Sequence, residues 1–316
     1  MPHPRSSVMP AALITGGAGF IGSHIAALLH GRTELRALDN FRSGQAENLE
    51  GLGVELFEGS ILDTSLLARA LSGVSHVFHL AAMVSVEESL ERPLDCVEVN
   101  VCGTLRLLEA AAAAGVRRVV FSSSAAVYGE RPEAVKREDL PPDPRSPYAI
   151  AKLDGEYYCR LYAAERGLQT VSLRYFNVYG PRQDPASPYA AAVPIFIRRA
   201  LAGEPLEIFG DGQQTRDFVY AADVAEANLL AATHPDAAGV YNVGSESVLT
   251  IADLARRIIG STGSSSPIRF LPPRPGDLRH SRAATARLRA LGFRPRYSLE
   301  QGLSRTIASF QERKGR

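Results

Sequence analysis

The sequence predicts an α/β fold, a Rossmann-type doubly wound parallel sheet with a smaller α/β lobe at its C-terminal end. Three observations carry this prediction. Short apolar strands alternate with helical patterns in the first half, a glycine-rich turn joins the first strand to the first helix, and proline and glycine become denser from Gly180 onward. Such alternation is typical of a parallel sheet covered on both faces. With 316 residues, the chain suffices for one large domain or two ordinary ones.

The first half is expected to supply most of the parallel sheet. Its expected strands are the short apolar runs Ala11–Thr15, Leu35–Asp39, Val54–Glu58, His76–Ala81 and Arg118–Ser123. The expected helices are Ile21–Leu29, a helix capped by Asp63 and ending at Leu71, Asn100–Ala114, and one that Ser146-Pro147 opens and that runs to about Gly167. Gly115 is a C-terminal signal, and a serine cap before a first-turn proline is a start signal.

The second half is less regular. Helices are expected at Ile195–Ala202, Ala222–Thr233, Ile251–Ile259 and Leu299–Phe310, with strands at Leu206–Phe209, Asp217–Val219 and Val240–Val243. Loops are expected at 181–188, 261–266 and 272–276. We divide the chain into a dinucleotide-binding domain, 1–176, that also receives part of about 215–247, and a substrate-binding lobe, 177–316, interleaved with it.

Charge and composition exclude several classes of protein. Thirty-five Lys and Arg against 34 Asp and Glu leave a formal net charge of +1, which provides no general field for nucleic acid or an anionic membrane. No apolar run reaches the roughly 18 residues of a membrane span, and the N-terminus lacks the apolar core of a signal peptide. The three cysteines have no ligand or disulfide spacing. A cytoplasmic protein without a metal site is expected.

The glycine-rich turn predicts a dinucleotide site. Gly16 and Gly19 permit a tight turn close to a pyrophosphate, Gly22 lets the helix pack on the strand, and the helix N-terminus attracts phosphate. Asp39 ends the next strand, where a carboxylate accepts a hydrogen bond from a ribose 2′-hydroxyl and repels a 2′-phosphate. NAD is therefore favoured over NADP, although Arg42 stands nearby.

A tyrosine and a lysine four residues apart predict the catalytic chemistry. Tyr148 and Lys152 share one face of a helix. A free phenol has a pKa near 10, but a neighbouring ammonium and a cationic nicotinamide ring both favour the phenolate. Ser124 follows a strand whose carboxyl end faces the predicted crevice, where its hydroxyl can share a substrate proton with Tyr148.

These motifs together resemble the extended short-chain dehydrogenase/reductase superfamily, and most closely its nucleotide-sugar 4-epimerases. The resemblance covers nearly the whole chain. It includes G-G-A-G-F-I-G at 16–22, H-L-A-A at 79–82, N-V-C-G-T at 100–104, S-S-S-A-A-V-Y-G at 122–129, R-Y-F-N-V-Y-G-P at 174–181, T-R-D-F-V-Y at 215–220 and R-P-G-D at 274–277.

The resemblance implies roles for individual residues. Ser124, Tyr148 and Lys152 would be catalytic. The NAD site would be formed by Gly16, Gly19, Phe20, Ile21, Gly22, Asp39, Asn40, Ser43, Ser60, Ile61, Leu80, Ala81, Asn100, Ser122, Tyr148, Lys152 and Tyr175. The substrate would be held by Ser124, by Asn177, Arg216 and Arg274 on the diphosphate, by Asp277 on the uridine ribose, by Val193, Phe209 and Val248 around the uracil, and by Ser281. Core packing remains an alternative for Phe209 and Val248, and a salt bridge to Asp217 or another surface acid remains one for Arg216.

Single positions bear on the branch of the family. Related dehydratases and decarboxylases carry an acidic residue just before V-Y-G, where this chain has Ala125 and Ala126, so simple epimerisation through a transient 4-keto sugar is favoured. Ser281 falls where enzymes confined to UDP-glucose and UDP-galactose have tyrosine, and R-Q-D-P at 182–185 resembles the subgroup that prefers N-acetylated sugars. Two departures are Ser60, in place of an aspartate, and Val84, in place of a sugar-binding lysine.

UDP-GlcNAc and UDP-GalNAc are the favoured substrates. UDP-glucose 4-epimerase, UDP-glucuronate 4-epimerase, a nucleotide-sugar dehydratase or decarboxylase, and a non-catalytic NAD-binding regulator are the alternatives. The family likeness also implies a homodimer that pairs the helices Asn100–Ala114 and Tyr148–Gly167 with their copies, although their alanines would equally suit intramolecular contacts.

Overall fold

The computed structural model describes residues 9–184, 191–273 and 279–314. Its main element is a seven-stranded parallel sheet with the strand order β11-β7-β5-β4-β1-β2-β3. The strands are β1 (Ala11–Thr15), β2 (Glu34–Asp39), β3 (Val54–Glu58), β4 (His76–His79), β5 (Arg118–Ser124), β7 (Gln169–Tyr175) and β11 (Gly239–Val243). The strand order reverses between β1 and β4, and in such sheets ligands bind beside the carboxyl ends at this point.

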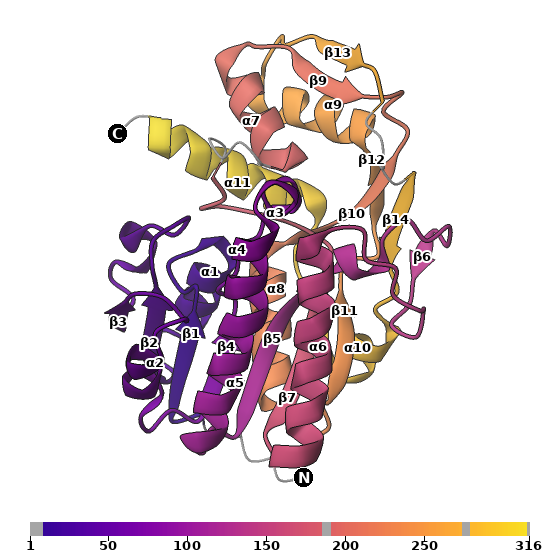
Figure 1. Ribbon diagram of the computed structural model, residues 1–316. Coiled ribbons are helices and arrows are strands. Elements are labelled where there is room, and N and C mark those ends of the chain that lie inside the picture. The colour runs from indigo at the N-terminus through magenta and orange to yellow at the C-terminus, as the bar shows by residue number, and fades with distance from the viewer. Residues whose placement is uncertain (1–8, 185–190, 274–278, 315–316) are drawn as a thin grey trace, which may run out of the picture.

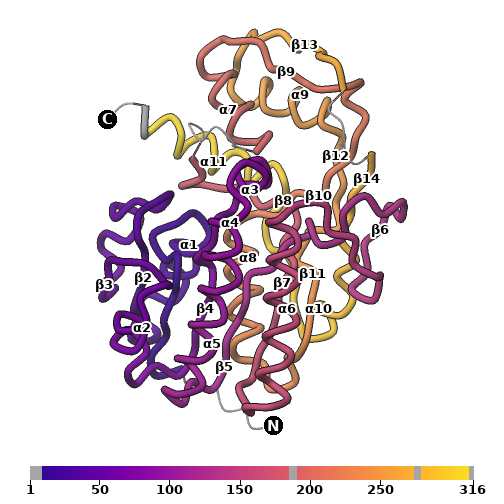
Figure 2. The backbone as a smooth tube through the Cα atoms, viewed as in Figure 1, coloured from indigo at the N-terminus to yellow at the C-terminus, as the bar shows by residue number. Residues whose placement is uncertain are grey.

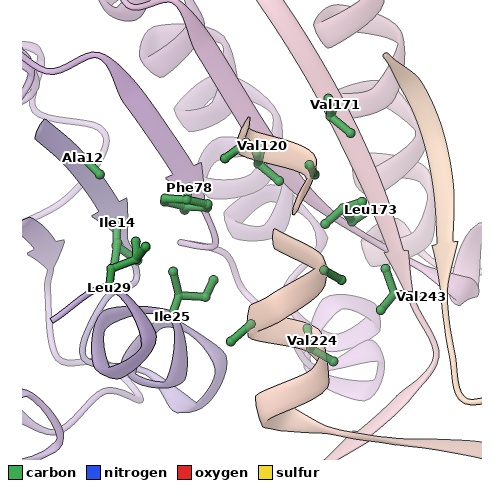
Figure 3. Close-up of a cluster of buried hydrophobic side chains, with 14 of the residues drawn as sticks. Ala12, Ile14, Ile25, Leu29, Phe78, Val120, Val171, Leu173, Val224 and Val243 are labelled. Carbon is green, nitrogen blue, oxygen red and sulfur yellow. The ribbon is translucent and has the colours of Figure 1, made fainter. Parts of the chain in front are cut away.

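Helices cover both faces of this sheet, as the alternation predicted. Helices α1 (Phe20–Leu29) and α8 (Ala221–Thr233) cover one face, and α2 (Thr64–Leu71), α5 (Gly103–Ala113) and α6 (Pro147–Arg166) cover the other. Figure 3 shows the first of these cores, in which side chains such as Ile14, Phe78 and Leu173 from the strands meet Ile25 of α1 and Val224 of α8. The predicted fold class is confirmed.

A smaller lobe lies beyond the carboxyl ends of the sheet strands (Figure 1). It contains a sheet in the order β12-β10-β14-β6, with β8 also paired to β10, and a separate pair, β9 and β13. Its strands are β6 (Val135–Lys136), β8 (Asn177–Tyr179), β9 (Leu206–Phe209), β10 (Thr215–Tyr220), β12 (Val248–Thr250), β13 (Ile268–Leu271) and β14 (His280–Ala283). Its helices α7 (Ala192–Ala202), α9 (Ile251–Thr262) and α11 (Leu299–Lys314) share a third hydrophobic core.

The path of the backbone in Figure 2 passes from the large sheet to the lobe and back. The edge strand β11 comes after β8, β9 and β10 in the chain, yet it pairs with β7 in the large sheet. The division of the chain near residue 176 stays a prediction.

Several elements differ from the sequence-based expectations. The segment between β4 and β5 contains α3 (Val86–Glu91), α4 (Pro93–Val97) and a π-helical turn, Glu98–Cys102, before α5, whereas one helix from Asn100 was expected. Strand β4 ends at His79, two residues early, and α9 continues to Thr262 into an expected loop. Strand β7 and the short strands β6, β8, β12, β13 and β14 were not expected, nor were the turns η1 (Ala46–Leu49) and η3 (Ala125–Tyr128) and helix α10 (Ala286–Ala290).

No helix within 9–184, 191–273 and 279–314 has the length and apolar character needed to span a membrane. Cys96, Cys102 and Cys159 are free thiols, and the first and last of these are buried.

Candidate active site

The glycine turn after β1 forms a close-packed cradle at the strand-order reversal. Gly16 has φ +70°, and a Cβ there would lie 2.8 Å from the backbone nitrogen of Ala81. A Cβ on Gly22 would lie 2.2 Å from the Gly16 carbonyl oxygen. Gly19 is the N-cap of α1 and contributes no capping side chain. The first N–H groups of this helix are thus oriented toward the turn, an arrangement that suits a phosphate.

Asp39 lies at the carboxyl end of β2 and organises both sides of the cradle. Its Oδ2 accepts a hydrogen bond from the Ala18 N–H at 2.9 Å, and its Oδ1 accepts one from the Phe41 N–H at 2.8 Å. Burial raises the pKa of Asp39, and these backbone N–H groups oppose that rise. A carboxylate has further lone pairs, so a ribose hydroxyl can still donate to it. The cradle and Asp39 together fit a dinucleotide.

The other predicted cofactor residues lie at the same end of the sheet, but they differ in burial and in the contacts they make. Leu80 and Ala81 are half-buried directly after β4, Asn40 and Ser43 are exposed after β2, and Phe20 and Ile21 open α1. Ile61 is buried against Gly103. Ser60 Oγ accepts a hydrogen bond from the Leu62 N–H at 3.2 Å, so this hydroxyl has a local structural role.

Asn100 fixes the loop that follows β4. Its Oδ1 accepts from the Met83 N–H at 2.7 Å, and its Nδ2 donates to the Met83 carbonyl at 2.9 Å. The residue sits in the π-helical turn, a distortion often found at functional sites. Nearby, buried His79 is held between Thr15 at 2.7 Å and Thr104 at 3.0 Å, and burial lowers its pKa to about 3.

The three predicted catalytic residues meet at the carboxyl end of β5. Ser124 ends the strand, and its hydroxyl is close enough to the Tyr148 side chain to lower the pKa of that phenol. Lys152 lies one turn further along α6, with Nζ 5.8 Å from the centre of the Tyr148 ring and 2.7 Å from the Ser122 carbonyl oxygen, to which it donates. Ser122 Oγ and the Tyr175 hydroxyl are 3.0 Å apart, so the strand end is hydrogen-bonded from both faces.

Burial governs the protonation of this group. It lowers the pKa of Lys152 to about 8 and raises the pKa of Tyr148, with the Ser124 hydrogen bond opposing the latter change. The expected lowering of the Tyr148 pKa by Lys152 is therefore not produced by the chain alone, because the loss of hydration raises that pKa. A further positive charge at the site would have to favour the phenolate.

A buried ion pair lies directly behind these residues. Glu156 of α6 receives Arg174 of β7 through Nε at 2.8 Å and Nη2 at 2.7 Å, and Ser123 Oγ donates to the same carboxylate at 2.5 Å. Both charged side chains are at most 5% exposed. Because Ser123 lies between Ser122 and Ser124, this network fixes β5, β7 and α6 relative to one another.

Four predicted substrate residues gather on the smaller sheet. Asn177 of β8 donates to the Asp217 carbonyl at 3.0 Å, and Arg216 of β10 is paired in register with Ser281 on one side and Leu249 on the other. Val248 pairs with Asp217. The Asp217 carboxylate accepts from Ser245, Glu246 and Ala283, which disfavours the alternative in which it binds Arg216.

The other described residues that are predicted to bind the substrate do not lie on this smaller sheet. Phe209 lines an open hollow of about 520 Å³ with Gln214, Pro273 and Arg279, as a base-binding residue would. Val193 is only 1% exposed inside the core of the lobe, so its role at the uracil stays a prediction. Arg274 and Asp277 lie outside the described residues, as do Pro185 of the R-Q-D-P segment and residues 186–190 that follow it.

Helix α3 contributes to the site without having been expected. Ser89 Oγ accepts a hydrogen bond from the Tyr148 N–H at 3.2 Å and so anchors the start of α6. Glu88, beside it, forms an ion pair with Arg42 of the loop after β2. The serine before this helix is a capping signal, with Ser85 Oγ accepting from the Glu88 N–H, and it was the one available sequence clue.

Comparison with known proteins agrees with this geometry. Residues 12–244 match the sequence model of the NAD dependent epimerase/dehydratase family. The chain belongs to this family. It is similar to a UDP-glucose 4-epimerase of Mycolicibacterium smegmatis, with 41% identity over 95% of this chain and 98% of that protein.

Two solved structures show the same relationship. A UDP-N-acetylglucosamine 4-epimerase from Methanobrevibacter ruminantium, in complex with UDP-N-acetylmuramic acid, has a TM-score of 0.93 and 39% identity over 96% of this chain and 99% of its own. A Thermus thermophilus UDP-glucose 4-epimerase, in complex with NAD, has a TM-score of 0.88 and 41% identity over 95% and 99%. The family expected from the motifs, with nucleotide-sugar 4-epimerases as homologues, is confirmed, and so is NAD as the cofactor of this enzyme family.

Proposed function

We propose that this family member is a UDP-sugar 4-epimerase that acts on UDP-GlcNAc and UDP-GalNAc. The observation that carries the reaction type is the Ser124–Tyr148–Lys152 group, which stands at the end of β5 beside two alanines. Ala125 and Ala126 supply no carboxylate for an elimination or a decarboxylation. Proton transfer at one hydroxyl is the chemistry that this group can perform.

The residues divide the work at the sugar 4-hydroxyl. Tyr148 takes the hydroxyl proton and later returns it, while Ser124 shares that proton and orients the phenol. Lys152 holds the carbonyl end of β5 and contributes positive charge near the ring. Bound NAD supplies the acceptor for the hydride of sugar C4 and a cationic ring that favours the Tyr148 phenolate. The sugar passes through a transient 4-keto form and presents its other face to regain the hydride.

The choice of an acetylated sugar depends on Ser281. This residue is in register with Arg216, the predicted diphosphate ligand, so the two positions face the same stretch of substrate. A serine occupies less space than the tyrosine expected in glucose-confined relatives, which leaves room for a 2-acetamido group. Val84 is 63% exposed and offers no charge for a uronate.

The first test compares substrates without added NAD. Purified protein is given UDP-GalNAc, UDP-galactose or UDP-glucuronate in separate tubes, and NMR of the anomeric protons follows conversion. We expect fast conversion of the acetylated sugar, and roughly tenfold preference for UDP-galactose over UDP-GalNAc after Ser281→Tyr, since small steric differences give such ratios. Conversion of UDP-galactose alone by the unaltered protein would contradict the acetylated-sugar proposal, and a 4-keto or pentose product would contradict epimerisation.

We also propose that the protein is a homodimer. Helices α3, α4 and α6 adjoin one another, and large apolar side chains on and beside them are exposed. These are Leu90, Leu94, Val97, Ile150, Tyr157 and Leu161, each at least 45% exposed. Large apolar side chains exposed on adjoining helices are expected at an interaction surface. Sedimentation velocity should give the dimer mass, and Leu161→Glu should shift it to the monomer mass.

A further inference from the structure

An ion pair crosses the mouth of the predicted dinucleotide crevice. Arg42 follows β2, Glu88 belongs to α3 beyond β4, and β2 and β4 are the two neighbours of β1 in the sheet. Arg42 Nη2 donates to Glu88 Oε1. The pair therefore joins the loops on either side of the glycine turn.

Both ends of this ion pair are held in place by the chain. Phe41 has φ +54°, an uncommon conformation for a residue with a side chain, and the Asp39 carboxylate stabilises it through the Phe41 N–H. The Arg42 N–H donates to Asn40 Oδ1 at 3.2 Å. On the other side, Ser85 caps the Glu88 N–H at 3.0 Å. Backbone strain that several hydrogen bonds maintain is typical of a functional site.

The position of Arg42 matters for the choice between NAD and NADP. An arginine just beyond the strand that carries the ribose-binding carboxylate is the group that accommodates a 2′-phosphate. Arg42 stands three residues after Asp39, and on sequence alone it weakens the preference for NAD. In the structure, its guanidinium is engaged by the Glu88 carboxylate. Arg92 Nη1 also lies 3.8 Å from Glu88, but Arg92 pairs with Asp95.

We propose that Glu88 is a specificity-determining residue that acts through Arg42: it neutralises and positions the guanidinium so that the enzyme binds NAD and rejects NADP. Glu88 is then a positioning residue and takes no part in the reaction at the sugar. The proposal holds whichever UDP-sugar the enzyme converts. It also explains how an arginine can be kept at this position of an NAD-dependent protein.

The test measures which cofactor the protein carries. Purified protein is incubated with equal concentrations of NAD and NADP and passed through gel filtration, and the retained cofactors are released by heat and quantified by chromatography. We expect Glu88→Ala to lower the NAD-to-NADP ratio about fivefold, the scale of a partly exposed ion pair. Glu88→Gln should lower it less, and the exposed neighbour Glu87→Ala should leave it unchanged.

A variant that lacks both Arg42 and Glu88 distinguishes an effect of Glu88 through Arg42 from direct repulsion of the 2′-phosphate by Glu88. If Glu88 acts through Arg42, then Arg42→Ala alone keeps the original ratio and Arg42→Ala/Glu88→Ala returns to it. An unchanged ratio in Glu88→Ala would overturn the proposal. So would a gain in NADP that persists in the double variant, because Glu88 would then repel the phosphate directly.

Discussion

At the carboxyl end of the large sheet, many of the predicted cofactor residues stand in short runs at or directly after the ends of β1, β2 and β4. In the smaller lobe, the predicted substrate residues come singly from β8, β9, β10, β12 and β14. The first region offers mainly backbone N–H groups around a closely packed glycine turn, whereas the second offers side chains assembled from distant segments. Backbone recognition depends on local sequence and is therefore easily predicted, and side-chain recognition depends on tertiary placement.

The largest effect is expected at Tyr148, where the cofactor region and the substrate region meet. Tyr148→Phe should lower kcat by roughly 10²- to 10⁴-fold, the usual contribution of a positioned acid–base group. NAD content and Tm should stay the same, because the ring remains. Tyr157→Phe, at a 47% exposed position on the same helix, is the control and should keep full activity. A Tyr148→Phe variant with more than a tenth of the original kcat would argue against the assigned proton transfer.

A change to the backbone cradle should affect the cofactor alone. Gly22→Ala places a Cβ 2.2 Å from the Gly16 carbonyl oxygen, so the turn must shift. NAD affinity should fall roughly fivefold to a hundredfold, equivalent to the 1–3 kcal/mol that forced overpacking costs.

The control for this change is Gly260→Ala in α9 of the lobe, where a Cβ would meet nothing within 4 Å. It should leave NAD affinity unchanged and stabilise the helix by up to about 1 kcal/mol. Bound NAD is measured by fluorescence titration. An equal loss of NAD affinity in Gly22→Ala and Gly260→Ala would show that the packing of the glycine turn does not determine NAD binding.

Lowering the pH should destabilise the large-sheet region more than the smaller lobe. Burial lowers the pKa of His24 to about 4, of His76 to about 4 and of His79 to about 3, and all three belong to the large-sheet region. In the unfolded chain these groups gain protons below their ordinary pKa of 6.5, while in the folded chain they stay neutral. Their stabilising contribution is complete above pH 6.5 and is lost toward pH 3–4, by up to about 1.4 kcal/mol per pH unit for each histidine.

Hydrogen exchange between pH 7 and pH 5 should therefore show β4 losing protection before α9 of the lobe. His79→Asn, which removes one titrating group, should reduce the dependence of stability on pH. A slope that is unchanged in this variant would exclude His79 as a contributor.

The strands show why parts of the fold escaped sequence-based prediction. Strand β7 has the sequence Q-T-V-S-L-R-Y, which looks half-exposed because polar residues alternate with apolar ones. In the structure, Ser172 and Arg174 are buried, and Arg174 is buried because Glu156 binds it across the sheet–helix interface. A polar residue with a distant buried partner cannot be recognised from its neighbours in the chain.

The candidate site shows the same division. The spacing of Tyr148 and Lys152 on one helix and the serine at the end of β5 were local signals, and the structure brings these residues together. The π-helical turn that aims Asn100, and the bond from Tyr148 to Ser89, join segments that no periodicity relates. The lobe strands β6, β8, β12 and β14 are two to four residues long, too short for a recognisable pattern.

The late arrival of β11 has a consequence for how the protein is made. Until residue 243 has left the ribosome, β7 has an unpaired edge, and until residue 233 has left it, α1 lacks its neighbour α8. At about 5–20 residues per second, translation from residue 175 to 243 leaves that edge open for several seconds. Exposed strand edges invite pairing with other chains. A nascent chain arrested between these points is therefore the form of this protein most in need of a chaperone.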